Sequence, residues 1–382
     1  MAPLLLVVLS VTDASPDAGI DTSDDAPEQL SDGGVEADFE PGEGASTGDG
    51  GIHYTLDLSD AELKKRWLDS PQTLGSVAFG LVEEGRLLNS VRFPDGEGWV
   101  VVSEQAYATQ ETIDQLTGAF HAWHGKYPAA PPIRVNAISG PEGGFIRPHT
   151  THQNGRDADI GLVYPTGEQP RTREREKVMD VEKNWALAKE LVTRCDVQFI
   201  LLDYRVQAVL YKYALEHGED KAWLDSLFHA GFASVFQHAR RHRDHFHVRL
   251  YNARAQELGR RLTPLLALRP DQNVTFHRVQ KGDTLGHIAV KYGSSVRALR
   301  NANHIKNDML SLGHVLQVPM RKPCTRCPVP PDVVVPTRHW PPGFELAAEP
   351  APPKTSSGAP AQAIDFPVPD WDNGYSRSPG AF

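Results

Sequence analysis

The sequence predicts an α+β protein in which a mixed domain of helices and strands precedes a small βααβ unit. Three observations predict this organisation. Apolar residues in 53–256 follow helical spacing in some stretches and strand spacing in others, without a regular βαβ repeat. Residues 273–320 hold a strand–helix–helix–strand pattern of their own. Residues 1–52 are acidic with few large apolar side chains and residues 321–382 are rich in proline, so both are expected to be disordered.

The N-terminal segment combines a short apolar run with an acidic stretch. Leu4 to Leu9, followed by Thr12 to Ser15, resembles a secretory signal, although the run is short and no positive charge precedes it. The first fifty residues hold twelve acidic residues and no Lys or Arg, so the rest carries 39 basic against 37 acidic residues. This near-neutral balance excludes the basic footprint of a nucleic-acid-binding protein. No later stretch reaches the roughly 18 apolar residues of a membrane span, so none is expected.

Between these tails, residues 53–256 predict a folded domain. Helical spacing of apolar residues occurs at Glu111–Trp123, Val181–Cys195, Val206–Leu215 and Trp223–His229. Strand-like runs occur at Trp99–Val102, Ile133–Val135, Val197–Leu202 and Arg243–Leu250. Residues 257–272 are expected to be a linker to the βααβ unit.

Two clusters of histidine and carboxylate residues stand out in this domain, at Arg147–Ile160 and His242–Arg249. On a strand, His245 and His247 project to the same face, because side chains alternate, and Phe246 points into a core. Any single histidine is more simply explained as a core or solvated side chain. Two such clusters in one domain rarely arise by chance, so they indicate a functional site.

The spacing within the clusters is suited to a metal ion. A glycine-containing loop separates His152 from Asp159 and lets the chain return, so that an imidazole and a carboxylate face one point. Two histidine nitrogens, one carboxylate oxygen and one open position make a catalytic zinc site. Such a zinc lowers the pKa of its water to about 7, and a neighbouring histidine can act as the base.

The same residues resemble the penicillin-insensitive murein endopeptidases of the LAS metallopeptidase group, whose motif is H-x6-D followed by H-x-H. The resemblance covers roughly residues 74–252. It implies a LAS-type domain with a small central antiparallel sheet and flanking helices. It also implies a zinc peptidase that hydrolyses the D-alanyl–meso-diaminopimelate cross-links of peptidoglycan. This substrate and the signal-like start together indicate the periplasm. The implied zinc ligands are His152, Asp159 and His247.

The resemblance also implies roles for the neighbouring residues. His245 would be the base close to the metal-bound water, with His242 as a second catalytic residue and His149 lining the pocket. Asp157 either lines the pocket and orients a metal ligand or is a solvated loop carboxylate. Arg249 is expected to form a structural salt bridge.

Two alternative functions remain open at this point. Within the same group, the domain could be a D,D-carboxypeptidase or dipeptidase that trims stem peptides. In a different class, the chain could be a non-catalytic wall-binding protein. The chain has no Ser-x-x-Lys sequence, so the serine route of penicillin-binding proteins has no support.

Residues 273–320 closely resemble the lysin motif (LysM). The pattern opens at His277–Leu285, with a helix capped at Asp283 or Thr284, and closes at Gly313–Pro319. The implied partner is a glycan that contains N-acetylglucosamine, in peptidoglycan or chitin. The implied contact residues are Gly282, Asp283, Thr284, Asn303 and Ile305. The apolar residues expected in the core are Leu285, Ile288, Leu299 and Val315.

The three cysteines predict no zinc ribbon, because a second C-x-x-C pair is missing. In an exported protein, Cys324 and Cys327 are expected to form a local disulfide. Cys195 stands in an apolar segment and is expected to be a buried side chain.

Overall fold

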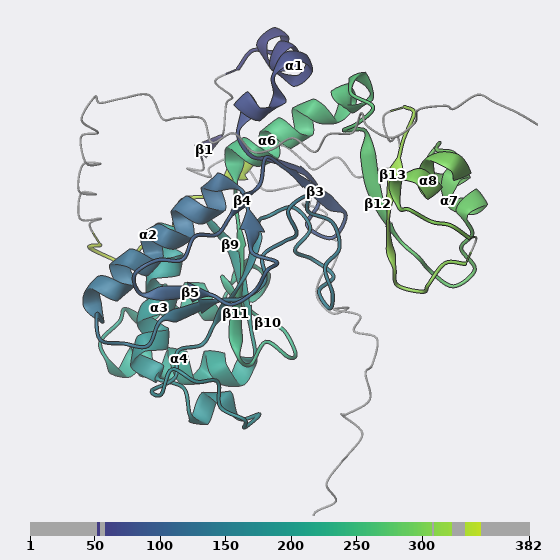
Figure 1. Ribbon diagram of the computed structural model, residues 1–382. Coiled ribbons are helices and arrows are strands. Elements are labelled where there is room, and N and C mark those ends of the chain that lie inside the picture. The colour runs from purple at the N-terminus through teal and green to yellow at the C-terminus, as the bar shows by residue number, and fades with distance from the viewer. Residues whose placement is uncertain (1–51, 54–57, 308, 323–332, 345–382) are drawn as a thin grey trace, which may run out of the picture. The chain divides into compact units, whose positions relative to one another are not determined.

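The computed structural model describes residues 52–53, 58–307, 309–322 and 333–344, and its larger part is a mixed helix and sheet domain (Figure 1). Its main sheet has six strands in the order β10-β9-β11-β8-β7-β5. The strands are β5 (Trp99–Val101), β7 (Ile133–Val135), β8 (Asp157–Gly161), β9 (Val197–Leu202), β10 (Phe236–His238) and β11 (His245–Leu250). The predicted α+β class is therefore confirmed.

The sheet differs from the small antiparallel sheet that the resemblance implied. The pairs β9–β10 and β5–β7 are parallel, while the three inner pairs are antiparallel. Parallel neighbours need a long crossover between them. One crossover contains helix α2 (Gln110–Lys126), and the other contains α4 (Tyr204–Glu216) and α5 (Lys221–Phe228). These helices thus explain the mixed sheet.

The predicted helices are all present and lie beside the sheet (Figure 1). Helix α3 (Val181–Arg194) packs against α2, and the predicted apolar face of α2 is almost fully buried. Each of these four helices begins at a side-chain cap, at Thr109, Asp180, Asp203 and Asp220. A cap satisfies one of the free N–H groups of the first turn, which fixes where the helix starts. Cys195 is buried at the end of α3, as predicted.

A second, smaller core occupies residues that were expected to be a linker. Helix α6 (Ala253–Leu262) and the 3-10 turn η5 (Thr263–Leu268) cover residues 257–268 of this range. Leu258, Leu262 and Leu266 pack with α1 (Asp60–Asp69) and β2 (Val77–Gly80). Their i, i+4 spacing forms an apolar stripe that needs a partner surface. The folded domain therefore extends beyond the predicted boundary.

Leu262→Ala should consequently destabilise the protein by about 2–5 kcal/mol, because it leaves a cavity in a packed core. Leu262 is 0% exposed, whereas Leu268 in the adjoining turn is 47% exposed. The matched change Leu268→Ala should alter the free energy of unfolding by no more than about 0.5 kcal/mol. Urea denaturation of both variants checks this, and equal small effects would mean that the segment behaves as a linker.

Several short elements complete this part of the chain. The strands β2 and β3 (Gly85–Leu88) form a hairpin, and β4 (Val91–Arg92) pairs with β6 (Tyr107–Ala108). The 3-10 turns are η2 (Pro71–Leu74), η3 (Arg175–Lys177) and η4 (Gly231–Ala233).

Part of the predicted C-terminal tail is ordered. Strand β14 (Val334–Val335) pairs with β1 (Ile52–His53). Arg338 lies 2.7 Å from Asp196, and the Trp340 indole donates to the carbonyl of Thr193. A proline-rich composition therefore did not exclude specific docking here. The signal-like start, the acidic stretch and the Cys324–Cys327 pair lie outside the described residues.

The unit at 273–320 has the predicted βααβ order. Strands β12 (Val274–Arg278) and β13 (Val315–Pro319) pair antiparallel, with α7 (Leu285–Lys291) and α8 (Val296–Ala302) between them. Its core contains the predicted Leu285, Ile288 and Leu299. Val315 is only half-buried, because strand alternation gives the inward positions of β13 to Leu316 and Val318.

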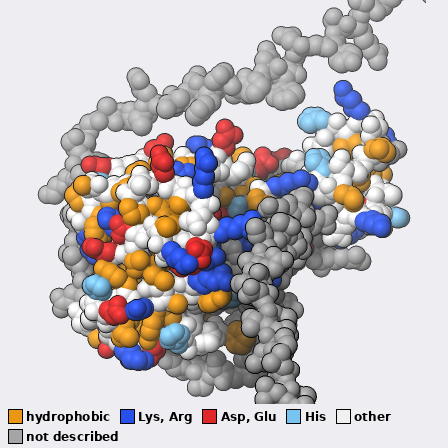
Figure 2. Space-filling view, turned by 90° about the horizontal axis from the view of Figure 1, so that it is seen from below, with side chains coloured by type: hydrophobic (Ala, Val, Ile, Leu, Met, Phe, Trp, Pro, Cys, Tyr) orange, Lys and Arg blue, Asp and Glu red, His pale blue; other side chains and the backbone are white. Residues whose placement is uncertain are grey.

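On the face shown in Figure 2, acidic and basic side chains are interspersed with hydrophobic ones. This agrees with the near-neutral balance of residues 51–382. Among the described residues, no helix has the length and apolar character that crossing a membrane requires.

Candidate functional site

The candidate site is built on the pairing of β8 with β11. In this register His247 stands opposite Asp159, and Arg249 stands opposite Asp157. Alternation sends Phe246 and the other intervening side chains of both strands into the core, as predicted. The two strands thus present a row of carboxylates facing a row of cationic or imidazole side chains.

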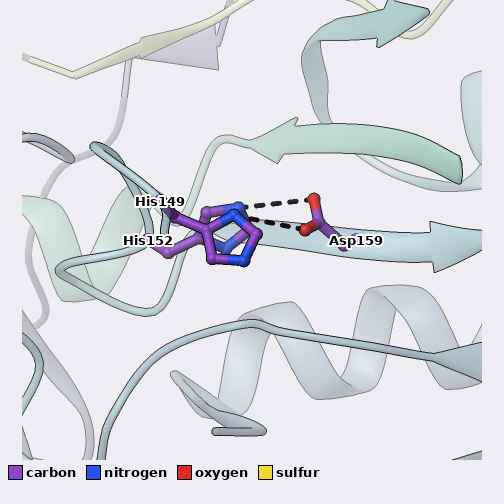
Figure 3. Close-up of side chains that lie close together, drawn as sticks. All are labelled: His149, His152 and Asp159. Carbon is purple, nitrogen blue, oxygen red and sulfur yellow. Dashed lines mark ion pairs between the residues drawn. The ribbon is translucent and has the colours of Figure 1, made fainter. Parts of the chain in front are cut away.

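The loop before β8 adds two more histidines, His149 and His152 (Figure 3). The backbone of His152 has φ of 66°, a conformation that costs energy for a residue with a side chain. At Gly155, φ is 76°, and a Cβ there would lie 2.8 Å from Leu87. Only glycine suits this turn, which returns the chain toward Asp159. Strained backbone next to a buried imidazole is typical of a functional loop.

Three side-chain atoms that could bind a metal ion lie close to one another. His152 Nε2 lies 3.2 Å from His247 Nδ1 and 3.3 Å from Asp159 Oδ1, and His247 Nδ1 lies 3.0 Å from the same oxygen. Ligands about 2.0–2.1 Å from a tetrahedral zinc ion are separated by roughly 3.3 Å. The three side chains have exposures of at most 4%. Their spacing and chemistry therefore fit one small metal ion.

His149 offers an alternative third ligand. His149, His152 and Asp159 have ligand atoms within 4.8 Å of one another, so this group could hold a metal ion (Figure 3). His149 Nδ1 lies 3.6 Å from Asp159 Oδ2, and its side chain is 25% exposed. The two possible ligand sets share His152 and Asp159 and differ in whether His247 or His149 completes them. The closer approach and deeper burial favour His247.

The second ring nitrogens of His152 and His247 meet oxygen atoms of the protein. His152 Nδ1 lies 3.0 Å from the carbonyl oxygen of Ile138. His247 Nε2 lies 3.3 Å from Asp157 Oδ2, but without hydrogen-bond geometry. Metal-binding histidines usually have such a partner on the far side of the ring, which fixes the tautomer. Asp157 itself accepts two hydrogen bonds from Arg249, at 2.8 and 2.9 Å. The predicted salt bridge of Arg249 is therefore present, and Asp157 lies beside His247.

Burial and neighbouring charged groups shift the pKa values of the side chains at the centre of the site. Burial alone would raise the pKa of Asp159, but the neighbouring histidines outweigh burial and hold this pKa well below its ordinary value. Burial would lower the pKa of His247, yet Asp157 and Asp159 raise it to about 9. Burial and the nearby imidazoles lower the pKa of His149 to about 4. His149 is therefore a neutral donor at neutral pH, while Asp159 is a carboxylate.

The remaining two predicted histidines lie at the edge of this centre. His245 Nε2 lies 3.6 Å from Asp159 Oδ1, and the side chain is 19% exposed. The ring of His242 lies 4.9 Å from that of His245 and 5.5 Å from that of His247. Burial and the neighbouring His245 lower the pKa of His242 to about 4. The structure thus brings all seven predicted side chains of the site together.

Two contacts of the site were missed by sequence reasoning. The Asp244 carboxylate lies 2.7 Å from His245 Nδ1. Asp244 and His245 are adjacent in the sequence, and this adjacency could have predicted the pair. The other missed partner, the carbonyl of Ile138, is a backbone group, and no side-chain pattern announces it.

The βααβ unit has a separate arrangement, described by its own contacts. His277 Nε2 lies 2.8 Å from Asp283 Oδ2, which also accepts the N–H of Gln280. The side chain of Thr284, and not that of Asp283, caps α7. Asn303 bonds to both backbone groups of Gln317. These bonds fix the turn before α7 and join the end of α8 to β13.

A comparison with protein families matches this unit over residues 277–319. It is a LysM domain. Such a domain fits a cell-wall-binding module for peptidoglycan or another N-acetylglucosamine-containing glycan, and it indicates a wall-associated or extracellular protein. No curated protein matches the chain.

Of the five residues predicted to contact glycan, three directly precede α7 and two follow the end of α8. The side chains of Asp283, Thr284 and Asn303 make the hydrogen bonds within the domain that are described above. Ile305 packs partly against the LysM core. Gly282 has φ of 92° and open space where a side chain would begin.

Proposed function

We propose that the mixed domain is a zinc-dependent endopeptidase that hydrolyses the D-alanyl–meso-diaminopimelate cross-links of peptidoglycan in the periplasm. The observation that carries this proposal is the convergence of His152 Nε2, Asp159 Oδ1 and His247 Nδ1 within 3.0–3.3 Å of one another. The LysM domain in the same chain supports a wall substrate, since tethering raises the local concentration of cross-links.

Each residue of the site has a distinct part in this proposal. His152, Asp159 and His247 would hold the ion, which when bound would supply a water of lowered pKa and polarise the scissile carbonyl. His245 holds and moves a proton at Nε2, the ring nitrogen nearest Asp159. His242 and His149 are both neutral at neutral pH and line the site, where they can donate or accept hydrogen bonds to the peptide.

Digestion of purified peptidoglycan tests the activity. Wild-type protein should convert cross-linked dimers to monomers, stop when a chelator removes the metal, and resume with zinc. Mass spectrometry reads the products. Monomers that lose terminal D-Ala while dimers survive would identify a carboxypeptidase instead. No change in any product, with binding retained, would leave a wall-binding protein without this activity.

The identity of the metal needs its own arm of the experiment. Two histidines and one carboxylate with open positions also suit iron(II). Metal-free protein should therefore be reloaded separately with zinc and with iron(II), and its activity compared. Recovery with iron(II) alone would contradict the zinc assignment while keeping the ligand set.

A further inference from the structure

Asp244 forms a close pair with His245 but has no role in the proposed function. Asp244 Oδ1 lies 2.7 Å from His245 Nδ1. Burial alone would raise the pKa of Asp244, but the hydrogen bond from His245 and the charges of His245 and Arg175 outweigh it and lower this pKa. The Asp244 side chain is therefore a carboxylate at neutral pH. A carboxylate only accepts hydrogen bonds, so the proton between these groups belongs to His245 Nδ1.

The backbone around Asp244 is held on two sides. Its carbonyl accepts the N–H of Leu162 at 3.0 Å, directly after β8. Its neighbour Arg243 donates two hydrogen bonds to Glu176 in the turn η3. Both attachments join the start of β11 to the chain that follows β8. The Asp244 carboxylate is thus presented to His245 from a fixed position.

We infer that Asp244 is a positioning residue that keeps the proton of His245 on Nδ1 and leaves Nε2 free to accept a proton in the site. His245 Nε2 is the atom that faces Asp159, at 3.6 Å. With the opposite tautomer, Nε2 would carry a hydrogen and could not act as a base. This inference rests on the proposed function for its catalytic consequence, but the tautomer can be measured without any activity.

Three substitutions at Asp244 distinguish a carboxylate that positions the His245 proton from a side chain that only fills space. Asp244→Ala removes the acceptor, and Asp244→Asn adds an amide that can donate to Nδ1 and favour the opposite tautomer. Both should lower kcat by about 10- to 100-fold with zinc content and KM unchanged. Asp244→Glu restores a carboxylate and should recover part of the loss. Asp225→Asn is the matched control, since Asp225 on α5 accepts from His229 Nδ1 at 3.3 Å, and it should leave kcat unchanged.

The ¹⁵N chemical shifts of the His245 ring give the direct readout. They are assigned by their loss in His245→Gln and measured in the metal-free and zinc-loaded full chain. Wild type should show a protonated Nδ1 and an unprotonated Nε2 in the neutral ring, and Asp244→Asn should shift the population toward Nε2–H. An unchanged tautomer in both Asp244→Ala and Asp244→Asn would overturn the inference, as would a kcat loss that matches a loss of zinc. If wild type cleaves no cross-link, the proposed function fails and the ¹⁵N shifts still decide the role of Asp244.

Discussion

Replacing His247 with alanine should abolish both zinc binding and hydrolysis of cross-links, whereas His149→Ala should keep most of the zinc. His247 Nδ1 lies within 3.2 Å of both shared ligand atoms, while His149 Nδ1 approaches Asp159 only to 3.6 Å. Loss of a hydrogen bond that supports a ligand reduces metal affinity by about 10- to 100-fold. Loss of a ligand itself should reduce zinc affinity by more than this. Metal content after dialysis, measured by mass spectrometry, gives the first comparison.

The controls must separate loss of a ligand from loss of folding. His247 is buried between two carboxylates, so its removal takes a hydrogen-bond partner from Asp159. His247→Gln keeps most of the volume and should also lose zinc, and circular dichroism should show a native spectrum for both variants. Retention of zinc in His247→Ala together with its loss in His149→Ala would identify His149 as the third ligand.

LysM binding provides an internal test of specificity for these variants. The LysM core of Leu285, Ile288 and Leu299 shares no residue with the cluster at β8 and β11. Variants at His247 and His149 should therefore pull down with insoluble peptidoglycan as wild type does.

Local patterns predicted most of the architecture. The face of Ile113, Leu116, Phe120 and Trp123 predicted α2 because each residue meets the same core. The alternation of His245, Phe246 and His247 predicted the orientation of β11 for the same kind of reason. These predictions succeeded because burial of one face leaves a period in the sequence.

The errors concern features that leave no such period. The parallel pairing of β9 with β10 depends on which strand becomes a neighbour, and that choice is made by long-range packing. The position of residues 257–272 between two predicted units suggested a linker. The spacing of Leu258 and Leu262 nevertheless indicates an apolar stripe, and both residues are buried in a core. The docking of Trp340 was hidden by the proline-rich composition around it.

The candidate site divides in the same way. The resemblance to a known family implied the set of His152, Asp159 and His247, whereas spacing alone indicated only that the two clusters form a functional site. The register that places His247 opposite Asp159 joins residues far apart in the sequence. The sequence could not reveal that the Ile138 carbonyl lies behind His152, because that contact depends on the path of a separate segment. Nor could spacing decide between His149 and His247, which needs distances.

His245→Ala should keep most of the zinc and still lose about 100- to 10,000-fold in kcat, the usual contribution of a general acid or base. His245 Nε2 lies 3.6 Å from Asp159 Oδ1 and its side chain is 19% exposed, so it stands outside the three atoms that converge within 3.3 Å. Burial would lower the pKa of His245, but Asp159 and Asp244 outweigh burial and raise this pKa.

The comparison that decides this role is between His245→Ala and His247→Ala, made on the same peptidoglycan and with metal content measured in each. The two residues are two positions apart on one strand, so any general disturbance of β11 affects both. Loss of activity with zinc retained in the first, and loss of both in the second, assigns proton transfer to His245 and metal binding to His247. Equal zinc loss in the two variants would mean that the assignment of this pair is wrong, because His245 would then be a ligand and the base would have to be sought at His242 or His149.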